Sequence, residues 1–265
     1  MNNIKNNLLA IAVLITYIIM VTVNGLANAL PINGQDTGTI SDSYANLFAP
    51  AGITFTIWGL IYLLLLGHSI YQLIKAKKLY EDQSYKSVGL WFTFSSILNT
   101  IWIFAWHYEV IWLSLILMVG ILVSLIRINM ILRNMEFSFK DKIFIRIPFA
   151  VYFGWITVAS IANVTTFLVS VNWNGFGVSE VIWTDMIIII GAVIGFVAIL
   201  YYKSISYGLV IIWAYLGILI KHTSPEFFDA KYPSVIASVV ISILVIIVGE
   251  IILIRIKSRK GVNNG

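Results

Sequence analysis

The stretch LFAPAGITFTIWGLIY, residues Leu47–Tyr62, decides how the chain is interpreted, because it combines the start of an apolar helix with regularly spaced aromatic residues. Pro50 suits a first helical turn, since proline fixes its own φ and lacks the N–H that this turn leaves unpaired. Phe55, Trp58 and Tyr62 follow at positions i, i+3 and i+7, which places three rings on one helical face. We expect this face to form a ligand wall; the alternative is that the rings pack between helices or anchor at lipid headgroups.

The composition around this stretch is that of a membrane protein. Of the 265 residues, 60% are hydrophobic and only 11% are charged, whereas charged residues make up about a quarter of soluble domains. The chain has no cysteine, which excludes disulfides, zinc–thiolate sites, iron–sulfur clusters and cysteine nucleophiles. The sequence therefore predicts an all-α, polytopic transmembrane bundle.

About eight helices are expected, because eight apolar runs are candidates to cross a hydrocarbon core of about 30 Å. They cover residues 8–26, 50–74, 88–107, 110–132, 147–171, 181–202, 207–220 and 234–256. The first is expected to be a retained helix rather than a cleaved signal peptide. The seventh is the shortest, so we expect it to need its flanks to cross, or to be tilted or partly re-entrant. Residues 28–46 are expected to form a turn-rich outer loop, and residues 133–146 a charged inner loop.

The net charge of +5 reflects topology rather than nucleic-acid binding. With eight spans, every lysine and arginine except Lys221 and Lys231 falls at the end of the bundle that carries both termini. Because basic residues concentrate in short cytoplasmic segments, both termini are predicted to be cytoplasmic. A bacterial cytoplasmic membrane is the expected location, and the lipid bilayer is the expected environment.

Two more helices carry a face that combines amides with aromatic rings. The run at 88–107 places an amide and two indoles at i, i+3 and i+7, and the run at 147–171 places an indole, a small residue and an amide at i, i+4 and i+8. These candidate site residues are Asn99, Trp102 and Trp106 on the first helix and Trp155, Ala159 and Asn163 on the second. Taken singly, the amides are explained by interhelical hydrogen bonds worth about 0.6–2 kcal/mol each. Their repetition favours a shared cavity.

Residues 1–173 resemble the tryptophan-rich sensory protein (TspO/MBR) family of five-helix membrane proteins. The resemblance lies in IWGLIY, where the family has V-W-T-x-L-Y, in LNTIW, where it has L-N-x-x-W, and in the stripe P…W…A…N of residues 148–163. It implies a five-helix domain at 1–173, a three-helix extension at 174–265 and a homodimer. It also implies that porphyrins, sterols or synthetic aromatic molecules bind between the helices, at Trp58, Tyr62, Asn99, Trp102, Trp155, Ala159 and Asn163.

The sequence departs from the family pattern at three places. Gly52 stands where the family has an early tryptophan, and Ile103 stands where it has a small polar residue. Pro148 precedes Trp155 by seven residues rather than four. These changes bear on whether a porphyrin is the ligand.

The extension contains two carboxylates within predicted spans, Asp185 and Glu250. Intramembrane carboxylates are rare unless they have a partner or a task. For Glu250 the simple explanation is an ion pair with Arg255 one turn away, and the alternative is a proton or cation site. Asp185 lies near a helix end, where water can reach it.

Two functions remain open at this point. The first is the binding of an aromatic or polycyclic ligand, tetrapyrrole or sterol-like, with a sensory, regulatory or ligand-translocating output. The second is secondary transport of a small solute, coupled to protons or ions through Asp185 or Glu250. An enzyme is a distant third hypothesis, because the three histidines are scattered and no catalytic motif is present. No metal, no obligatory cofactor and no nucleic-acid partner are expected.

Overall fold

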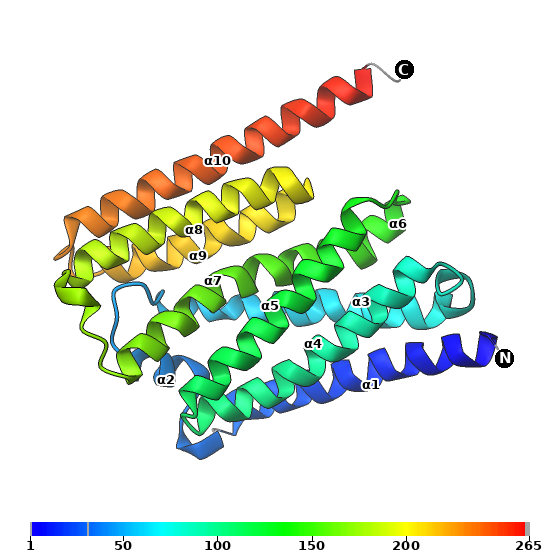
Figure 1. The fold of residues 1–265 in the computed structure, drawn as a ribbon, viewed down its shortest axis with the longest axis horizontal. Coiled ribbons are helices and arrows are strands. Elements are labelled where there is room, and N and C mark those ends of the chain that lie inside the picture. The colour runs from blue at the N-terminus through cyan, green and yellow to red at the C-terminus, as the bar shows by residue number, and fades with distance from the viewer. Residues whose placement is uncertain (1, 31, 263–265) are drawn as a thin grey trace.

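Long helices build the whole architecture (Figure 1). The computed structural model describes residues 2–30 and 32–262, and no strand occurs among them. The helices are α1 (Asn2–Ala29), α2 (Thr37–Ser43), α3 (Ile57–Leu79), α4 (Gln83–His107), α5 (Ile111–Arg133), α6 (Phe139–Asp141), α7 (Ile147–Ser170), α8 (Glu180–Tyr202), α9 (Ile205–Thr223) and α10 (Pro233–Val262). Short 3-10 turns lie at Ile32–Gly34 (η1), Gly52–Thr56 (η2) and Gly175–Gly177 (η4), and a π-helical turn, η3 (Lys142–Arg146), leads into α7.

The prediction of eight spans is confirmed within the described residues. By length and composition, eight helical segments are suited to cross a membrane. Large apolar side chains remain exposed along them, such as Leu63, Ile74 and Val197, as expected of surfaces that face lipid. The chain is thus an integral, multi-pass membrane protein. An even number of spans brings both termini to one end of the bundle (Figure 1), which we name the terminal end, and α2 lies at the opposite end, the α2 end.

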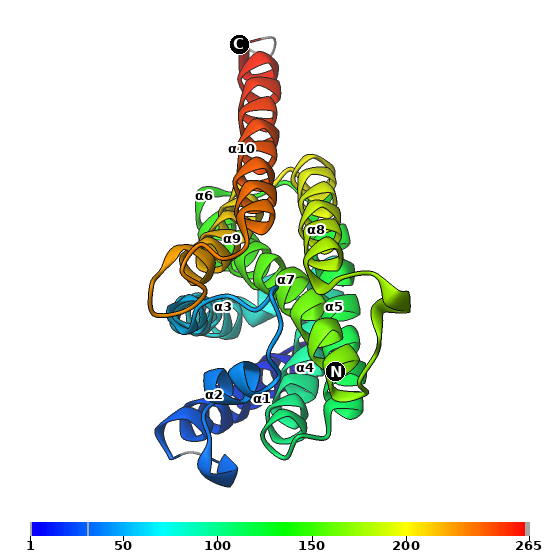
Figure 2. The same ribbon diagram turned by 90° about the vertical axis from the view of Figure 1, so that its left-hand side faces the viewer.

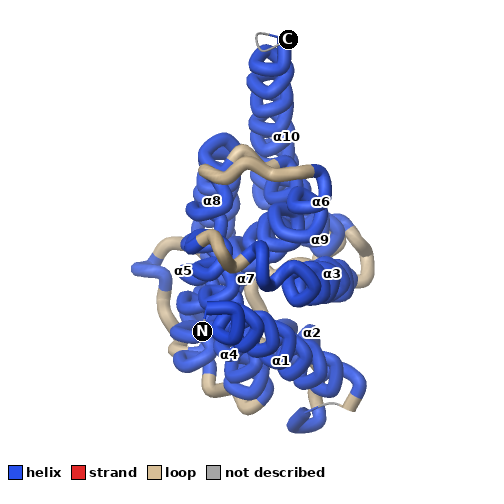
Figure 3. Tube along the Cα trace, turned by 90° about the vertical axis from the view of Figure 1, so that its right-hand side faces the viewer, coloured by secondary structure: helices blue, strands red, loops and turns tan. Residues whose placement is uncertain are grey.

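The spans form two groups joined through α7. Helices α1, α3, α4 and α5 surround α7 on one side, whereas α8, α9 and α10 pack together on the other (Figures 2 and 3). Helix α7 is the most buried span, with 72% of its central window buried, because it packs against α3, α5 and α9 at once. Its small residue Gly154 permits the close approach of α9 at Tyr207 and Val210.

The helix predicted from Pro50 begins differently. Pro50 and Ala51 precede a 3-10 turn at Gly52–Thr56, and the α-helix starts only at Ile57. Phe55 consequently lies on a tighter turn than Trp58 and Tyr62, and the three rings do not share one regular α-helical face.

Two further expectations are corrected by the structure, and a third is confirmed in part. The outer loop at 28–46 contains α2, whose first N–H groups are capped by the carboxylate of Asp36. The predicted inner loop at 133–146 is helical from Phe139 onward, because Ser138 and Asp141 form a capping box. The seventh span uses its flanks as expected, since α9 is one continuous helix of 19 residues, Ile205–Thr223, that includes His222, and it is not re-entrant.

Candidate functional site

An aromatic and polar cavity of about 440 Å³ lies near the α2 end, between α1, α2, α3 and α4. We refer to it as the outer compartment. Its walls combine indole and phenol rings with amides, hydroxyls and two carboxylates. The lining residues are Asn24, Asn28, Asp36, Thr37, Gly38, Thr39, Asp42, Gly52, Phe55, Thr56, Trp58, Tyr62, Trp102 and Ile103. Its volume falls within the range of about 300–1,000 Å³ that is typical of small-molecule sites.

A much smaller hollow of about 40 Å³, the inner compartment, continues toward α5 and α7. Four residues line both compartments: Thr37, Phe55, Trp58 and Trp102. The inner compartment is completed by Ser41, Pro50, Trp106, Met118, Trp155, Val158, Ala159, Ala162, Asn163 and Thr166. Helix α7 therefore contributes to the deep end of the site and not to its larger part.

Aromatic rings from α3, α4 and α7 form an aromatic wall along the two compartments. Trp58 stacks on Tyr62, with ring centroids 5.4 Å apart, and its edge meets Trp155 at 6.1 Å. On α4, Trp102 stacks on Trp106 at 5.6 Å. Such a wall can hold a planar apolar molecule by ring stacking, which contributes about 0.5–1.5 kcal/mol per aromatic pair beyond burial.

Three buried polar atoms on this wall have no hydrogen-bond partner among the described residues. They are the indole nitrogens Nε1 of Trp102 and of Trp155, and the hydroxyl of Thr37. An unpaired buried donor costs about 1–3 kcal/mol, so atoms of this kind are expected to meet a partner when the site is in use. Residues that line the inner compartment thus hold two N–H donors and a hydroxyl without a partner among the described residues.

The predicted amides have different surroundings. Asn99 is fully buried but does not line either compartment: its Oδ1 accepts from Asn24 Nδ2 at 2.8 Å, and its own amide donates to the hydroxyl of Tyr152 at 3.2 Å. Asn163 lines the inner compartment, and its Oδ1 accepts from Ser114 at 3.1 Å. Asn99 therefore holds Asn24 in the cavity wall, a contact that links α4 to α1.

Helix α2 covers the cavity. The Asp36 carboxylate accepts from the backbone N–H groups of Gly38 and Thr39, both at 2.8 Å, and so fixes the first turn of this short helix. The hydrogen bond from Thr39 is the main reason that the pKa of Asp36 is lowered. Trp106 Nε1 of α4 donates to the carbonyl of Thr37 at 3.2 Å, which ties the start of α2 to α4. The sequence signal for this cover is the Asp36 cap in front of a short polar stretch.

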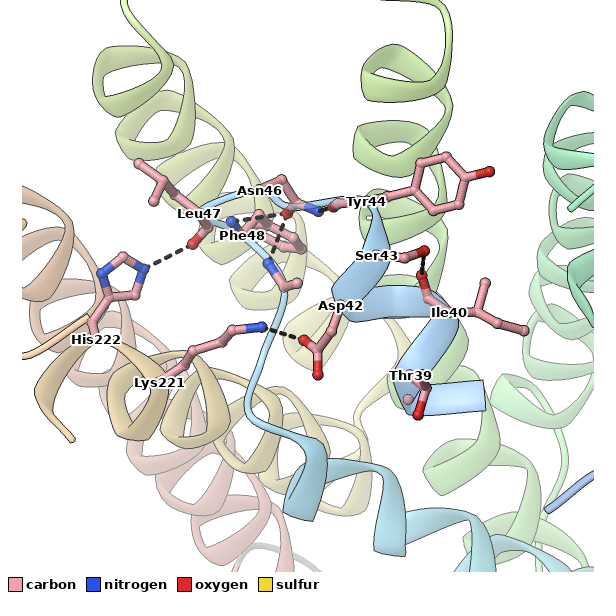
Figure 4. Close-up of polar contacts among 12 residues, drawn as sticks. Thr39, Ile40, Asp42, Ser43, Tyr44, Asn46, Leu47, Phe48, Lys221 and His222 are labelled. Atoms are coloured by element: carbon pink, nitrogen blue, oxygen red, sulfur yellow. Dashed lines mark hydrogen bonds and ion pairs between the residues drawn. The ribbon is translucent and has the colours of Figure 1, made fainter. Parts of the chain in front are cut away.

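The cover is also fastened to α9, a helix of the C-terminal group (Figure 4). Lys221 Nζ lies 2.6 Å from the carboxylate of Asp42, and this is the only ion pair among the described residues. Beside it, the carbonyl of Leu47 lies 2.8 Å from His222 Nε2. The N–H of Ala51 donates to the carbonyl of Gly217 at 3.0 Å. We refer to the contacts of residues 42–51 with α9 as the α9 latch.

Most of the predicted site residues come together. Phe55, Trp58, Tyr62 and Trp102 line the outer compartment, and Trp106, Trp155, Ala159 and Asn163 line the inner one. The sequence interpretation did not name Asn24 and Asn28 of α1 as site residues. It also assigned the α2 segment with its two carboxylates to a loop, because a short helix with polar residues resembles a loop.

Asp185 and Glu250 are not brought together. Asp185 is five residues from the start of α8 and Glu250 is 17 residues from the start of α10, which separates them by about 18 Å along the two helices at 1.5 Å per residue. Glu250 forms no ion pair with Arg255. Both of its carboxylate oxygens are buried and unpaired within the described part of the chain. Its carboxylate rests against Gly208 of α9, where a side chain would collide with it.

The fold and the site define the class: a multi-pass helical membrane protein with an aromatic cavity between its spans. A family model for TSPO-like proteins matches residues 10–252. The chain belongs to this family, and the match extends across the C-terminal helices α8 and α9 into α10. No curated protein and no solved structure matches the chain.

Proposed function

We propose that the protein binds a planar, largely apolar molecule with hydrogen-bond acceptors in the aromatic cavity. The buried, unpaired N–H groups of Trp102 and Trp155, two residues that line the inner compartment, carry this proposal. A ligand edge bearing a carbonyl or ring nitrogen would satisfy them, while its flat body stacks on Trp58 in the outer compartment. A tetrapyrrole and an oxygenated sterol both have this combination of a rigid apolar body and acceptor atoms.

The charges at the cavity distinguish among such ligands. Asp36 and Asp42 both line the outer compartment, and the hydrogen bonds to Asp36 favour its ionised form. No lysine or arginine lines either compartment, and Lys221 is engaged with Asp42. Because like charges repel, a ligand that keeps anionic groups in the outer compartment should bind more weakly than its neutral form. We therefore favour neutral ligands over a porphyrin with two free carboxylates.

Quenching of intrinsic tryptophan fluorescence tests the proposal. The purified protein in nanodiscs is titrated with protoporphyrin, with protoporphyrin dimethyl ester and with a sterol. The ester is expected to bind more tightly than the diacid. Replacement of Trp155 by Phe keeps a ring but removes the N–H, and should weaken binding about tenfold, as the loss of one buried hydrogen bond implies.

The matched control is Trp112→Phe, because Trp112 is 57% exposed on α5 and lines neither compartment. It should leave the dissociation constants unchanged. Equal affinities of the wild type and Trp155→Phe for every probe would remove the inner compartment from the binding site. Tighter binding of the diacid than of the ester would contradict the role of the carboxylates.

A second candidate function, coupled transport, rests on Glu250. A buried carboxylate without a hydrogen bond is costly in its ionised form, so a proton or cation at this position would be taken up and released as its surroundings change. Coupling would act through the contact between α9 and α10 at Gly208. Proteoliposomes give the test: if Glu250→Gln together with Asp185→Asn leaves proton-driven solute uptake unchanged, the coupling role is removed.

A further inference from the structure

A second pocket, of about 470 Å³, lies where α7 ends and α8 begins, at the α2 end of the bundle. We refer to it as the α7–α8 pocket. It shares no lining residue with the outer or the inner compartment. Trp173, Trp183 and Phe48 form its aromatic part, and the side chains of Asn46, Asn172 and Asn174 add amides. The pocket is therefore separate from the site described above and has its own chemistry.

The two indoles of this pocket are held in place by the loop between the helices. Their ring centroids lie 5.1 Å apart at an angle of 58°, so they do not stack and do not cover each other completely. Trp183 Nε1 donates to the carbonyl of Gly175 at 2.8 Å. Since the polar edge of Trp183 is satisfied within the protein, the ring face is the part of this residue that is available to a ligand.

The α7–α8 pocket carries negative charge and no positive charge. Glu180 is the only charged residue that lines it, and no lysine or arginine is present to hold an anion. One oxygen of this carboxylate, Oε1, accepts from the N–H of Leu47 at 3.1 Å. The other oxygen receives no hydrogen bond from the described residues. Indole faces attract cations through the ring quadrupole, and a carboxylate adds its full charge in the same direction.

We propose that the α7–α8 pocket binds an organic ammonium group, supplied either by a free small molecule or by a lipid headgroup. The indole faces of Trp173 and Trp183 contact the alkyl groups of the ammonium, and Glu180 neutralises its charge. Aromatic and carboxylate groups together are the usual recognition elements for quaternary ammonium ligands. The proposal does not depend on what occupies the aromatic cavity.

The test uses the full chain in phosphatidylglycerol nanodiscs, which contain no ammonium headgroup of the choline type. Choline is the probe, and saturation-transfer difference NMR measures its binding against 3,3-dimethyl-1-butanol, a neutral molecule of the same shape. Wild-type protein should bind choline saturably, and the neutral isostere should bind about tenfold more weakly or not at all, given the worth of a desolvated cation–π contact.

Two variants and one control distinguish the loss of a binding contact from a loss of folding. Glu180→Gln keeps an oxygen for the Leu47 N–H and should weaken choline binding about tenfold with an unchanged unfolding temperature. Trp173→Leu removes one aromatic face and should also weaken choline binding. Glu226→Gln is the matched control, because Glu226 is exposed in the segment between α9 and α10 and does not line the pocket. It should bind choline like the wild type.

Nanodiscs of phosphatidylcholine distinguish the two sources. Loss of free choline binding in these discs would identify a lipid headgroup as the occupant, whereas unchanged binding would identify a free small molecule; both results support the ammonium site. The proposal is overturned if wild-type protein shows no saturable choline binding. It is equally overturned if the neutral isostere binds as well as choline, or if Glu180→Gln has no effect.

Discussion

The α9 latch makes a sharp prediction about access to the aromatic cavity. Breaking the ion pair between Lys221 and Asp42 should loosen α2, since Asp42 lies within this helix and lines the outer compartment. Two substitutions break the pair from opposite sides. Lys221→Met removes the cation, whereas Asp42→Asn removes the anion and leaves the cation in place.

The expected magnitudes follow from the geometry. At 2.6 Å the Coulomb attraction is about 6 kcal/mol for an effective dielectric constant of 20. The side chain of Asp42 is 55% exposed, so water screens much of this Coulomb attraction. We expect Lys221→Met to weaken the latch by about 1 kcal/mol. The Lys221 side chain is only 11% exposed, so Asp42→Asn leaves a buried unpaired charge and should cost about 2 kcal/mol or more.

The chain contains no cysteine, so a single introduced thiol reports the opening of the cover. Ser41 is 8% exposed and lines the inner compartment, whereas Ser43 is exposed on the same helix. In a Ser41→Cys background, Lys221→Met should raise the rate of maleimide labelling about fivefold and Asp42→Asn about thirtyfold. In a Ser43→Cys background, both substitutions should leave a fast labelling rate unchanged.

A double-mutant cycle decides whether the pair itself is responsible. If Lys221 and Asp42 act as a pair, the double variant should label at about the rate of Lys221→Met alone, because the unpaired charge is gone. Strictly additive effects would refute the idea that this ion pair holds α2. So would labelling rates that change less than twofold in both single variants.

Three further outcomes are expected. Asp36→Ala should raise labelling of the same buried thiol about fivefold, since an N-cap is worth about 1 kcal/mol. The N–H of Thr39 lowers the pKa of Asp36, so the stabilisation by this cap is present above the ordinary aspartate pKa. It is lost as the pH falls through the lowered pKa. Asn99→Leu should lower thermal stability by about 1–3 kcal/mol, as it leaves the hydroxyl of Tyr152 without its partner and removes one of the two hydrogen bonds donated by Asn24. Gly217→Ala should lower the unfolding temperature, because its new methyl group collides with a side chain of η2, at a cost of about 1–3 kcal/mol.

The spans and the aromatic stripes could be predicted because they are local properties of the sequence. An apolar run of about 20 residues has few alternatives to a membrane helix. Rings at helical spacing share a face once the helix forms, which is why Trp102 and Trp106 are found stacked. Phe55 lies on a 3-10 turn before the α-helix, which starts at Ile57, yet its ring still lines the outer compartment with Trp58 and Tyr62.

Long-range pairings could not be predicted from the same patterns. Lys221 and Asp42 are 179 positions apart, and each alone resembles a solvated surface charge. Asn99 was expected to contact the ligand, but the rotation of α4 turns its amide toward Asn24 and Tyr152. Spacing along one helix gives the direction of a side chain relative to its neighbours on that helix, and not which other helix it faces.

The C-terminal helices do not line the aromatic cavity, but α9 holds the segment that borders it. Helix α9 contacts the segment that covers and borders the cavity at four places: Asp42, Leu47, Ala51 and Thr54. The last contact is a hydrogen bond of 3.0 Å from Trp213 Nε1 to a carbonyl of η2, the turn that carries Phe55 into the cavity. Helices α8 and α10 both pack on α9, so the whole C-terminal group is connected to the cover through α9. If the cavity binds the ligand proposed above, the C-terminal group is placed to respond to that ligand or to control its entry.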